Sequence, residues 1–77
     1  MTSSEILAMN LSYLIRKHDL LVKDIAVQAG VGTTTLYRAV KGLSVTTYTI
    51  DSIASAFDMQ GWQLLKPLYR EIPSEEE

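Results

Sequence analysis

The feature that most constrains the fold of this chain is a break at Gly30-Val31-Gly32, which separates two short helical patterns. The apolar spacing before the break predicts a helix over residues 22–29, and the spacing after it predicts a helix from Thr33 to about Lys41. The residues expected to face inward are Ile25, Ala26, Ala29, Leu36, Ala39 and Val40. Gly30 can adopt the left-handed conformation that ends a helix, and Gly32 can cap the next one. The sequence therefore predicts two short helices joined by a tight turn, with Gly42 ending the second.

A longer helix is predicted before this pair. Thr2 and Glu5 have the spacing of a capping box, which satisfies exposed amide groups at a helix start. Apolar residues then recur at the spacing of one buried helical face, and they are Leu7, Leu11, Leu14 and Ile15. We expect this first helix to end near His18.

Two more helices are predicted after the pair. Thr46 and Thr47 offer caps for a fourth helix, and residues 60–66 can form a short fifth helix that Pro67 would end. The apolar residues of these segments are Ile50, Ile53, Ala54, Phe57, Trp62, Leu64 and Leu65. The β-branched run at residues 45–50 leaves a strand as the alternative there.

Composition limits the class of protein. With 77 residues, 47% of them hydrophobic and none of them cysteine, the chain has room for one domain that must rest on helix packing alone. From the sequence we expect no targeting segment and no membrane-spanning run. No set of side chains has the spacing of a nucleophilic triad, a metal site or a phosphate-binding loop. We therefore expect no enzyme activity, no metal, no cofactor and no small-molecule substrate.

Charge is unevenly distributed along the chain. The net charge is −2, which by itself counts against a nucleic-acid partner. The segment 16–41, however, holds five basic residues against Asp19 and Asp24, and the five are Arg16, Lys17, Lys23, Arg38 and Lys41. The acidic residues Glu71, Glu75, Glu76 and Glu77 collect at the end of the chain, beside Pro73. This distribution leaves the helix pair basic and predicts a solvated acidic tail.

The helix pair resembles a known motif. Residues 20–42 resemble the helix-turn-helix of the phage repressor and Cro family, and about residues 10–66 are covered by the resemblance. The apolar residues that extend it beyond the motif are Leu11, Leu14, Ile50, Ile53, Ala54, Phe57, Met59, Leu64 and Leu65. The resemblance implies an all-α fold, namely a compact five-helix lambda-repressor-like DNA-binding domain whose helix after the turn enters the major groove.

The resemblance also implies a set of contacts to DNA. Thr33, Thr34, Tyr37 and Arg38 should lie on the outer face of the third helix and meet the bases. Tyr37 has packing at the rim of the core as its alternative role. Contacts to phosphates are expected from Lys23, Lys41 and Ser44.

The sequence departs from the family pattern at two positions. Val22 stands where many members carry a glutamine that binds phosphate, and Gly32 replaces the usual serine cap. Lys23 could supply a compensating phosphate contact. Glycine is an acceptable cap, so the third helix should still form.

Specific binding by one helix-turn-helix usually requires two copies about one DNA turn, ~34 Å, apart. We therefore expect a homodimer, with Trp62, Leu68, Tyr69 and Ile72 as candidate dimerisation residues. Trp62 is expected to pack in the core, the commoner role of tryptophan, with a place in the interface as its alternative. The domain should span residues 1–67, and residues 68–77 should form a tail that acts as a dimerisation strand or is a truncated linker.

The function that the resemblance implies is that of a sequence-specific transcriptional regulator. Its partner would be a double-stranded DNA operator with an inverted repeat, and its place would be the cytoplasm, on the nucleoid. Two alternatives stay open. A DNA-binding antitoxin would use the same helix together with a toxin partner, and a helical protein-interaction module would explain the overall acidity and Val22.

Overall fold

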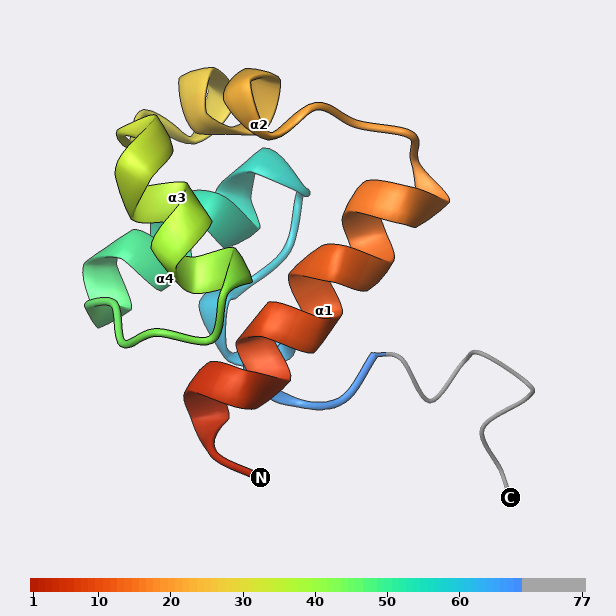
Figure 1. The fold of residues 1–77 in the computed structure, drawn as a ribbon, viewed down its shortest axis with the longest axis vertical. Helices are drawn as coiled ribbons and strands as arrows, with labels where there is room; N and C mark the ends of the chain where they lie inside the picture. The colour runs from red at the N-terminus through yellow and green to blue at the C-terminus, as the bar shows by residue number, and fades with distance from the viewer. Residues whose placement is uncertain (69–77) are drawn as a thin grey trace.

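The computed structural model describes residues 1–68 of the chain. These residues form α1 (Ser3–Lys17), α2 (Val22–Ala29), α3 (Thr33–Val40), α4 (Thr47–Ala56) and the 3-10 helix η1 (Gly61–Leu65) (Figure 1). The predicted all-α fold is confirmed. The described residues contain no strand, so the alternative of a strand at residues 45–50 was wrong. The fifth helix is a 3-10 helix that begins at Gly61 rather than at Gln60.

Helices α1 and α4 begin where the sequence offers side-chain caps. The Thr2 hydroxyl accepts a hydrogen bond from the Glu5 amide at 3.1 Å, and the Thr2 amide donates to the Glu5 carboxylate at 2.8 Å. This reciprocal pair is the predicted capping box, which satisfies two amide groups at the start of α1. Thr46 caps α4 through a single bond of this kind, because its hydroxyl accepts from the Thr49 amide at 3.1 Å.

The turn between α2 and α3 depends on Gly30. Its φ of 73° lies in the left-handed region, which costs glycine little because glycine lacks a Cβ atom. The Val31 amide then donates to the Ala26 carbonyl at 3.0 Å, so the chain folds back on the end of α2. Gly32 follows as the N-cap of α3. The predicted break therefore places α2 and α3 in direct contact.

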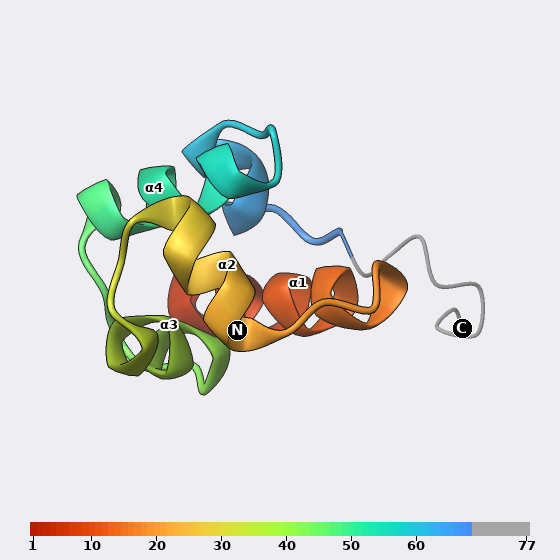
Figure 2. The ribbon, with the colours of Figure 1, turned by 90° about the horizontal axis from the view of Figure 1, so that it is seen from above.

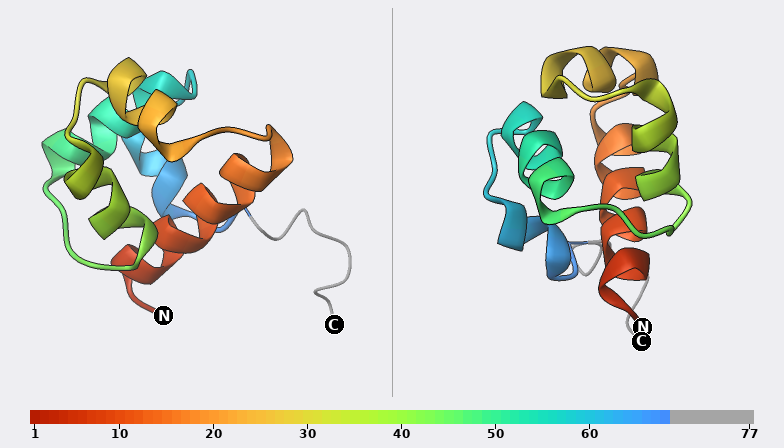
Figure 3. Two further views of the ribbon diagram at one scale, coloured as in Figure 1. Left: turned by 45° about the horizontal axis from the view of Figure 1, so that its top comes forward. Right: turned by 90° about the vertical axis from the view of Figure 1, so that its left-hand side faces the viewer.

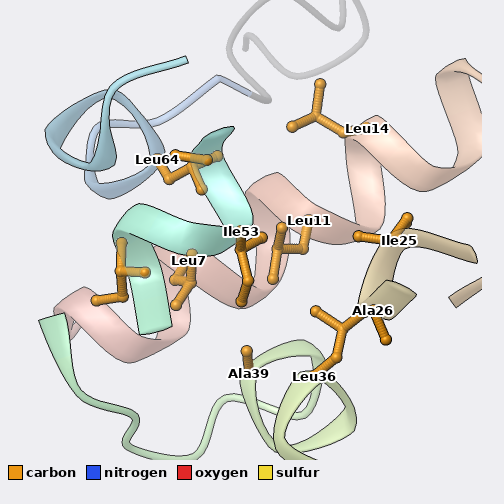
Figure 4. Close-up of a cluster of buried hydrophobic side chains, with 11 residues drawn as sticks. Leu7, Leu11, Leu14, Ile25, Ala26, Leu36, Ala39, Ile53 and Leu64 are labelled. Carbon is orange, nitrogen blue, oxygen red and sulfur yellow. The ribbon is translucent and has the colours of Figure 1, made fainter. Parts of the chain in front are cut away.

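The core lies where the four α-helices and η1 meet (Figure 4). Ala26 is 2% exposed where α2 approaches α3, and its small side chain permits that approach. The buried apolar residues are Leu7, Leu11, Leu14, Ile25, Ala26, Leu36, Ala39, Ile50, Ile53, Ala54 and Leu64. Ile15, Ala29, Val40, Phe57 and Leu65 were expected inside but are only partly buried around this cluster.

Asn10 is the one buried polar side chain among the described residues, and the sequence reasoning missed it. Its side-chain amide donates to the carbonyl groups of Leu64 at 2.6 Å and Lys66 at 2.8 Å, and its carbonyl oxygen accepts from the Leu68 amide at 2.7 Å. These three bonds join α1 to η1 and to the segment after it. A buried polar group destabilises the fold unless its hydrogen bonds are made. The bonds of Asn10 therefore favour the one arrangement of α1 and residues 64–68 in which all three are formed.

The arrangement of the helices separates two surfaces. α1 contacts both α3 and η1, while α2 contacts α3 and α4. Seen from above, α3 and η1 lie toward opposite sides of the molecule (Figure 2). The outward faces of α3 and η1 therefore belong to different surfaces of the molecule.

A substitution at the end of α4 should stabilise the domain. Asp58 has a φ of 63°, which lies in the left-handed region. The amide of the next residue, Met59, donates to the Ala54 carbonyl at 2.9 Å. We expect Asp58→Gly to raise the free energy of unfolding by about 0.5–1 kcal/mol, because glycine adopts this left-handed position with less strain. Urea denaturation measures the change. Asp58→Ala is the matched control and should lower the stability; a loss of stability with glycine would contradict the assignment of strain.

Candidate nucleic-acid interface

The exposed face of α3 carries the four residues predicted to meet bases. Thr33, Thr34, Tyr37 and Arg38 are all exposed, whereas Leu36 and Ala39 on the opposite face are fully buried. The four occupy positions i, i+1, i+4 and i+5, which lie on one side of a helix. Tyr37 is 46% exposed, so its ring is neither buried nor fully solvated. The structure thus brings the predicted base-contacting residues onto one continuous face.

Arg38 and Ser44 were predicted as separate contacts, but the structure links them. The Arg38 guanidinium donates through Nη2 to the backbone carbonyl of Ser44 at 3.2 Å. This bond ties the exposed side of α3 to the segment that leads into α4. A guanidinium has five N–H donors, so the remaining donors of Arg38 can still reach a base edge or a phosphate.

The first turns of α2 and α3 carry no side-chain caps. Leu21 and Gly32 are their N-cap residues, and neither makes a capping hydrogen bond through its side chain. Backbone N–H groups at a helix start, together with the helix dipole, favour negatively charged partners such as phosphate. The departures from the family pattern at Val22 and Gly32 therefore leave backbone amides, rather than a glutamine or a serine hydroxyl, at these two helix starts.

The three residues predicted to contact phosphates are all exposed. Lys23 lies in the first turn of α2, Lys41 is the C-cap residue of α3, and Ser44 follows in the segment before α4. Within residues 1–68, the ammonium groups of Lys23 and Lys41 contact no carboxylate. Their positive charges are therefore not neutralised by neighbouring side chains of that part of the chain.

The predicted dimerisation residues fall in different places. Trp62 on η1 is 62% exposed, so the expectation that it packs in the core was wrong. Its indole lies on another side of η1 from the buried Leu64, because residues i and i+2 do not share a face of a helix. Leu68 is partly buried against the core, with its amide bonded to Asn10. Tyr69 and Ile72 lie outside the described residues.

Residues 1–68 contain no group of three or more His, Cys, Asp or Glu side chains placed to hold a metal ion. Among the helices of that segment, none has both the length and the apolar character required to cross a bilayer.

Comparison with known proteins gives one match. A family model described as a Cro/C1-type HTH DNA-binding domain matches residues 10–67, which is most of the chain and includes α2, the turn and α3. Searches of curated proteins and of solved structures found no match. The matched range begins at Asn10, the residue that binds the far end of the domain.

Proposed function

The chain belongs to the Cro/C1-type helix-turn-helix DNA-binding family, and from that premise we propose that it is a sequence-specific transcriptional regulator. We propose that it acts as a repressor, occupying an operator in double-stranded DNA and blocking access to it. It would act where that DNA lies, in the cytoplasm and on the nucleoid. The proposal assigns binding rather than catalysis to the exposed face of α3.

The exposed face of α3 carries this proposal. It presents two threonine hydroxyls and methyl groups, a tyrosine and an arginine from a helix whose other face is fixed by Leu36 and Ala39 in the core. Threonine can bond to base edges and touch the thymine methyl group, and arginine pairs best with guanine. A helix anchored in this way can enter the major groove with its N-terminal residues leading.

Phosphate contacts would fix the register of α3 on the duplex. In this proposal Lys23 and Lys41 supply charge, Ser44 supplies a hydroxyl, and the uncapped start of α2 supplies backbone amides. Such contacts position the protein and contribute affinity, but they do not read sequence.

Lys41 gives a direct test of the phosphate contacts. We expect Lys41→Ala to weaken binding to all duplexes about equally and to reduce the slope of log K against log salt concentration by about 1 for each subunit, and so by about 2 for the proposed dimer. Fluorescence anisotropy at several salt concentrations measures this slope. Lys41→Arg keeps the charge and should keep the slope. An unchanged slope in Lys41→Ala would remove Lys41 from the interface.

The proposal includes a homodimer on an inverted repeat. A single helix-turn-helix reads few base pairs, and two copies about one DNA turn apart double the recognised sequence. Trp62 supports this part of the proposal, because a large exposed aromatic side chain is typical of interfaces. The proposed domain is residues 1–67, with residues 68–77 as a dimerisation strand or a truncated linker.

The proposed function is tested by selecting bound sequences from a random duplex pool with the purified full chain, at low and at physiological salt. An enriched inverted repeat is the expected result. A Thr33→Ala, Thr34→Ala double variant is the matched control, because it leaves the core unchanged and should lose the enriched motif. No enrichment at either salt would contradict the proposal and favour the interaction module. Co-purification of a second protein would favour the antitoxin.

A further inference from the structure

The exposed face of α3 lies in the longest stretch of the chain without an acidic residue. Between Asp24 and Asp51 the sequence holds Arg38 and Lys41 but no aspartate or glutamate. Both basic residues are exposed, and the Lys41 ammonium contacts no carboxylate within residues 1–68. This side of the domain therefore carries positive charge that the described residues do not neutralise.

The matching negative charge lies in residues 71–77, which we call the acidic segment. Four of its seven residues are glutamate and none is basic, so its formal charge is −4. Residues 1–68 have six lysine and arginine residues against five aspartate and glutamate residues, a formal charge of +1. Three of the glutamates are consecutive, and an extended chain places such charges about 3.3–3.6 Å apart. One strand of DNA has a phosphate about every 3.4 Å, so the charge density of the acidic segment is similar.

The acidic segment is tethered to one side of α1. The Leu68 amide donates to the side-chain carbonyl of Asn10 at 2.7 Å, which fixes the chain three residues before the segment begins. Gly42 lies against Ala8 of the same helix, since a Cβ atom on Gly42 would stand 3.9 Å from the Ala8 Cβ atom. Ala8 and Asn10 are two residues apart and so point to different sides of α1. Figure 3 shows α3 and η1 packed on these different sides, so α1 lies between the tether at Leu68 and Lys41, the neighbour of Gly42.

The acidic segment is long enough to reach the exposed side of α3. A helix with its side chains is about 10–12 Å in diameter. The first of the three consecutive glutamates, Glu75, is seven residues beyond Leu68, a span of up to ~23–25 Å. A tether of this length gives a local concentration in the millimolar range, so weak ion pairs are enough to populate a contact.

We propose that, in the absence of DNA, the acidic segment occupies the basic side of α3, with its glutamates beside Lys41 and Arg38, and that a duplex must displace it. The occupant of this surface is thus a segment of the same chain. The inference rests on the proposed function and adds regulation of the same site. Displacement costs the same for every duplex. The segment therefore suppresses binding to unrelated DNA, which depends on charge, while an operator keeps the additional free energy of its base contacts.

Neutralising the acidic segment tests the competition. The glutamine variant combines Glu75→Gln, Glu76→Gln and Glu77→Gln. We expect it to bind a duplex of unrelated sequence about three- to thirtyfold more tightly than the parent at ~0.1 M salt, since exposed ion pairs no longer oppose binding. The gap should narrow as salt is raised, because salt screens the ion pairs that inhibit the parent. Fluorescence anisotropy at several salt concentrations measures both effects.

A charge-matched control separates this contact from the general effect of net charge. Asp19→Asn, Asp51→Asn and Asp58→Asn together remove three negative charges from exposed residues outside α3. Asparagine tolerates the left-handed backbone of Asp19 and Asp58, so the control should fold. At ~0.1 M salt it should gain about twofold or less, since charges more than a Debye length of about 10 Å from the duplex are screened. An equal gain in the control and in the glutamine variant would overturn the contact.

A nitroxide label locates the acidic segment without DNA. The chain has no cysteine, so Ser74→Cys gives a single labelling site directly before the three glutamates. We expect the label to broaden the amide NMR signals of residues 38–44 at low salt, and we expect this broadening to disappear in the glutamine variant. Broadening confined to α1 would overturn the proposal.

The outcomes for the acidic segment and for the proposed function are separable. A chain that selects DNA sequences, but whose glutamine variant binds no more tightly, keeps the proposed function and loses this inference. A chain whose label broadens α3 but which selects no DNA keeps the contact and loses the proposed function.

Discussion

Replacing Asn10 with alanine is expected to lower the free energy of unfolding by about 3–5 kcal/mol. The substitution removes all three hydrogen bonds between α1 and the residues from Leu64 to Leu68, and it leaves a buried carbonyl of Leu64 without its donor. A domain of this length is expected to have a total stability of only about 4–11 kcal/mol. The variant should therefore be partly unfolded at room temperature or melt at a much lower temperature.

Urea denaturation followed by circular dichroism measures the effect of Asn10→Ala. Met9→Ala is the matched control, because Met9 precedes Asn10 on α1 but is 38% exposed, and it should change the stability by about 0.5 kcal/mol or less. Asn10→Leu restores apolar volume but not the bonds, so it should remain clearly destabilised. If Asn10→Leu were as stable as the parent chain, packing volume rather than hydrogen bonding would account for the role of this residue.

Replacing Arg38 with alanine is expected to weaken binding to the selected operator by about 1–3 kcal/mol and to relax specificity at one base position. The expected loss has two sources. The guanidinium can bond bidentately to a guanine, and its bond to the Ser44 carbonyl ties α3 to the following segment. Anisotropy measurements on the operator and on its single-base variants give both the affinity and the specificity.

Arg38→Lys separates these roles of Arg38 from simple charge. Lysine keeps the positive charge but lacks the planar fork, so the salt dependence should be retained while discrimination at that base position falls. Equal discrimination by the lysine variant would show that Arg38 acts through charge alone. Unchanged affinity and specificity in Arg38→Ala would remove Arg38 from the interface.

The helix-turn-helix could be predicted from the sequence closely because its boundaries are set locally. Both ends of α2 fall where the sequence predicts them, and α3 ends one residue before Lys41. Gly30 determines the break between them, since its left-handed backbone conformation needs no contact from elsewhere in the fold. The capping box of α1 is equally local, because Thr2 and Glu5 are three residues apart.

The features that depend on distant contacts were less predictable. Asn10 stands on the buried face of α1 three residues after Leu7, a polar residue in an apolar position, but its partners lie more than 50 residues away. The exposure of Trp62 was unpredictable for the same reason, since it depends on contacts made by distant parts of the chain. The sequence predicted a short fifth helix carrying Trp62, Leu64 and Leu65. Which side of that helix faces the core depends on its contacts with α1 and α4, and the structure buries Leu64 and exposes Trp62.

The exposure of the candidate residues on one face of α3 could be predicted, but the hydrogen bond that links Arg38 to Ser44 could not. The periodicity of α3 is sufficient to separate Thr33, Thr34 and Arg38 from the buried Leu36, because helix geometry fixes which residues share a face. The bond from Arg38 to the Ser44 carbonyl depends on the path of the chain after α3, which no local pattern determines.

Amide chemical-shift mapping by NMR shows directly whether the exposed face of α3 binds DNA. The ¹⁵N-labelled chain would be titrated with the selected duplex and with an unrelated duplex of equal length. We expect the largest operator-specific shifts at residues 33–38, with smaller shifts shared by both duplexes at Lys23, Lys41 and Ser44. Shifts confined to α1, α4 or η1, with α3 unchanged, would contradict this expectation.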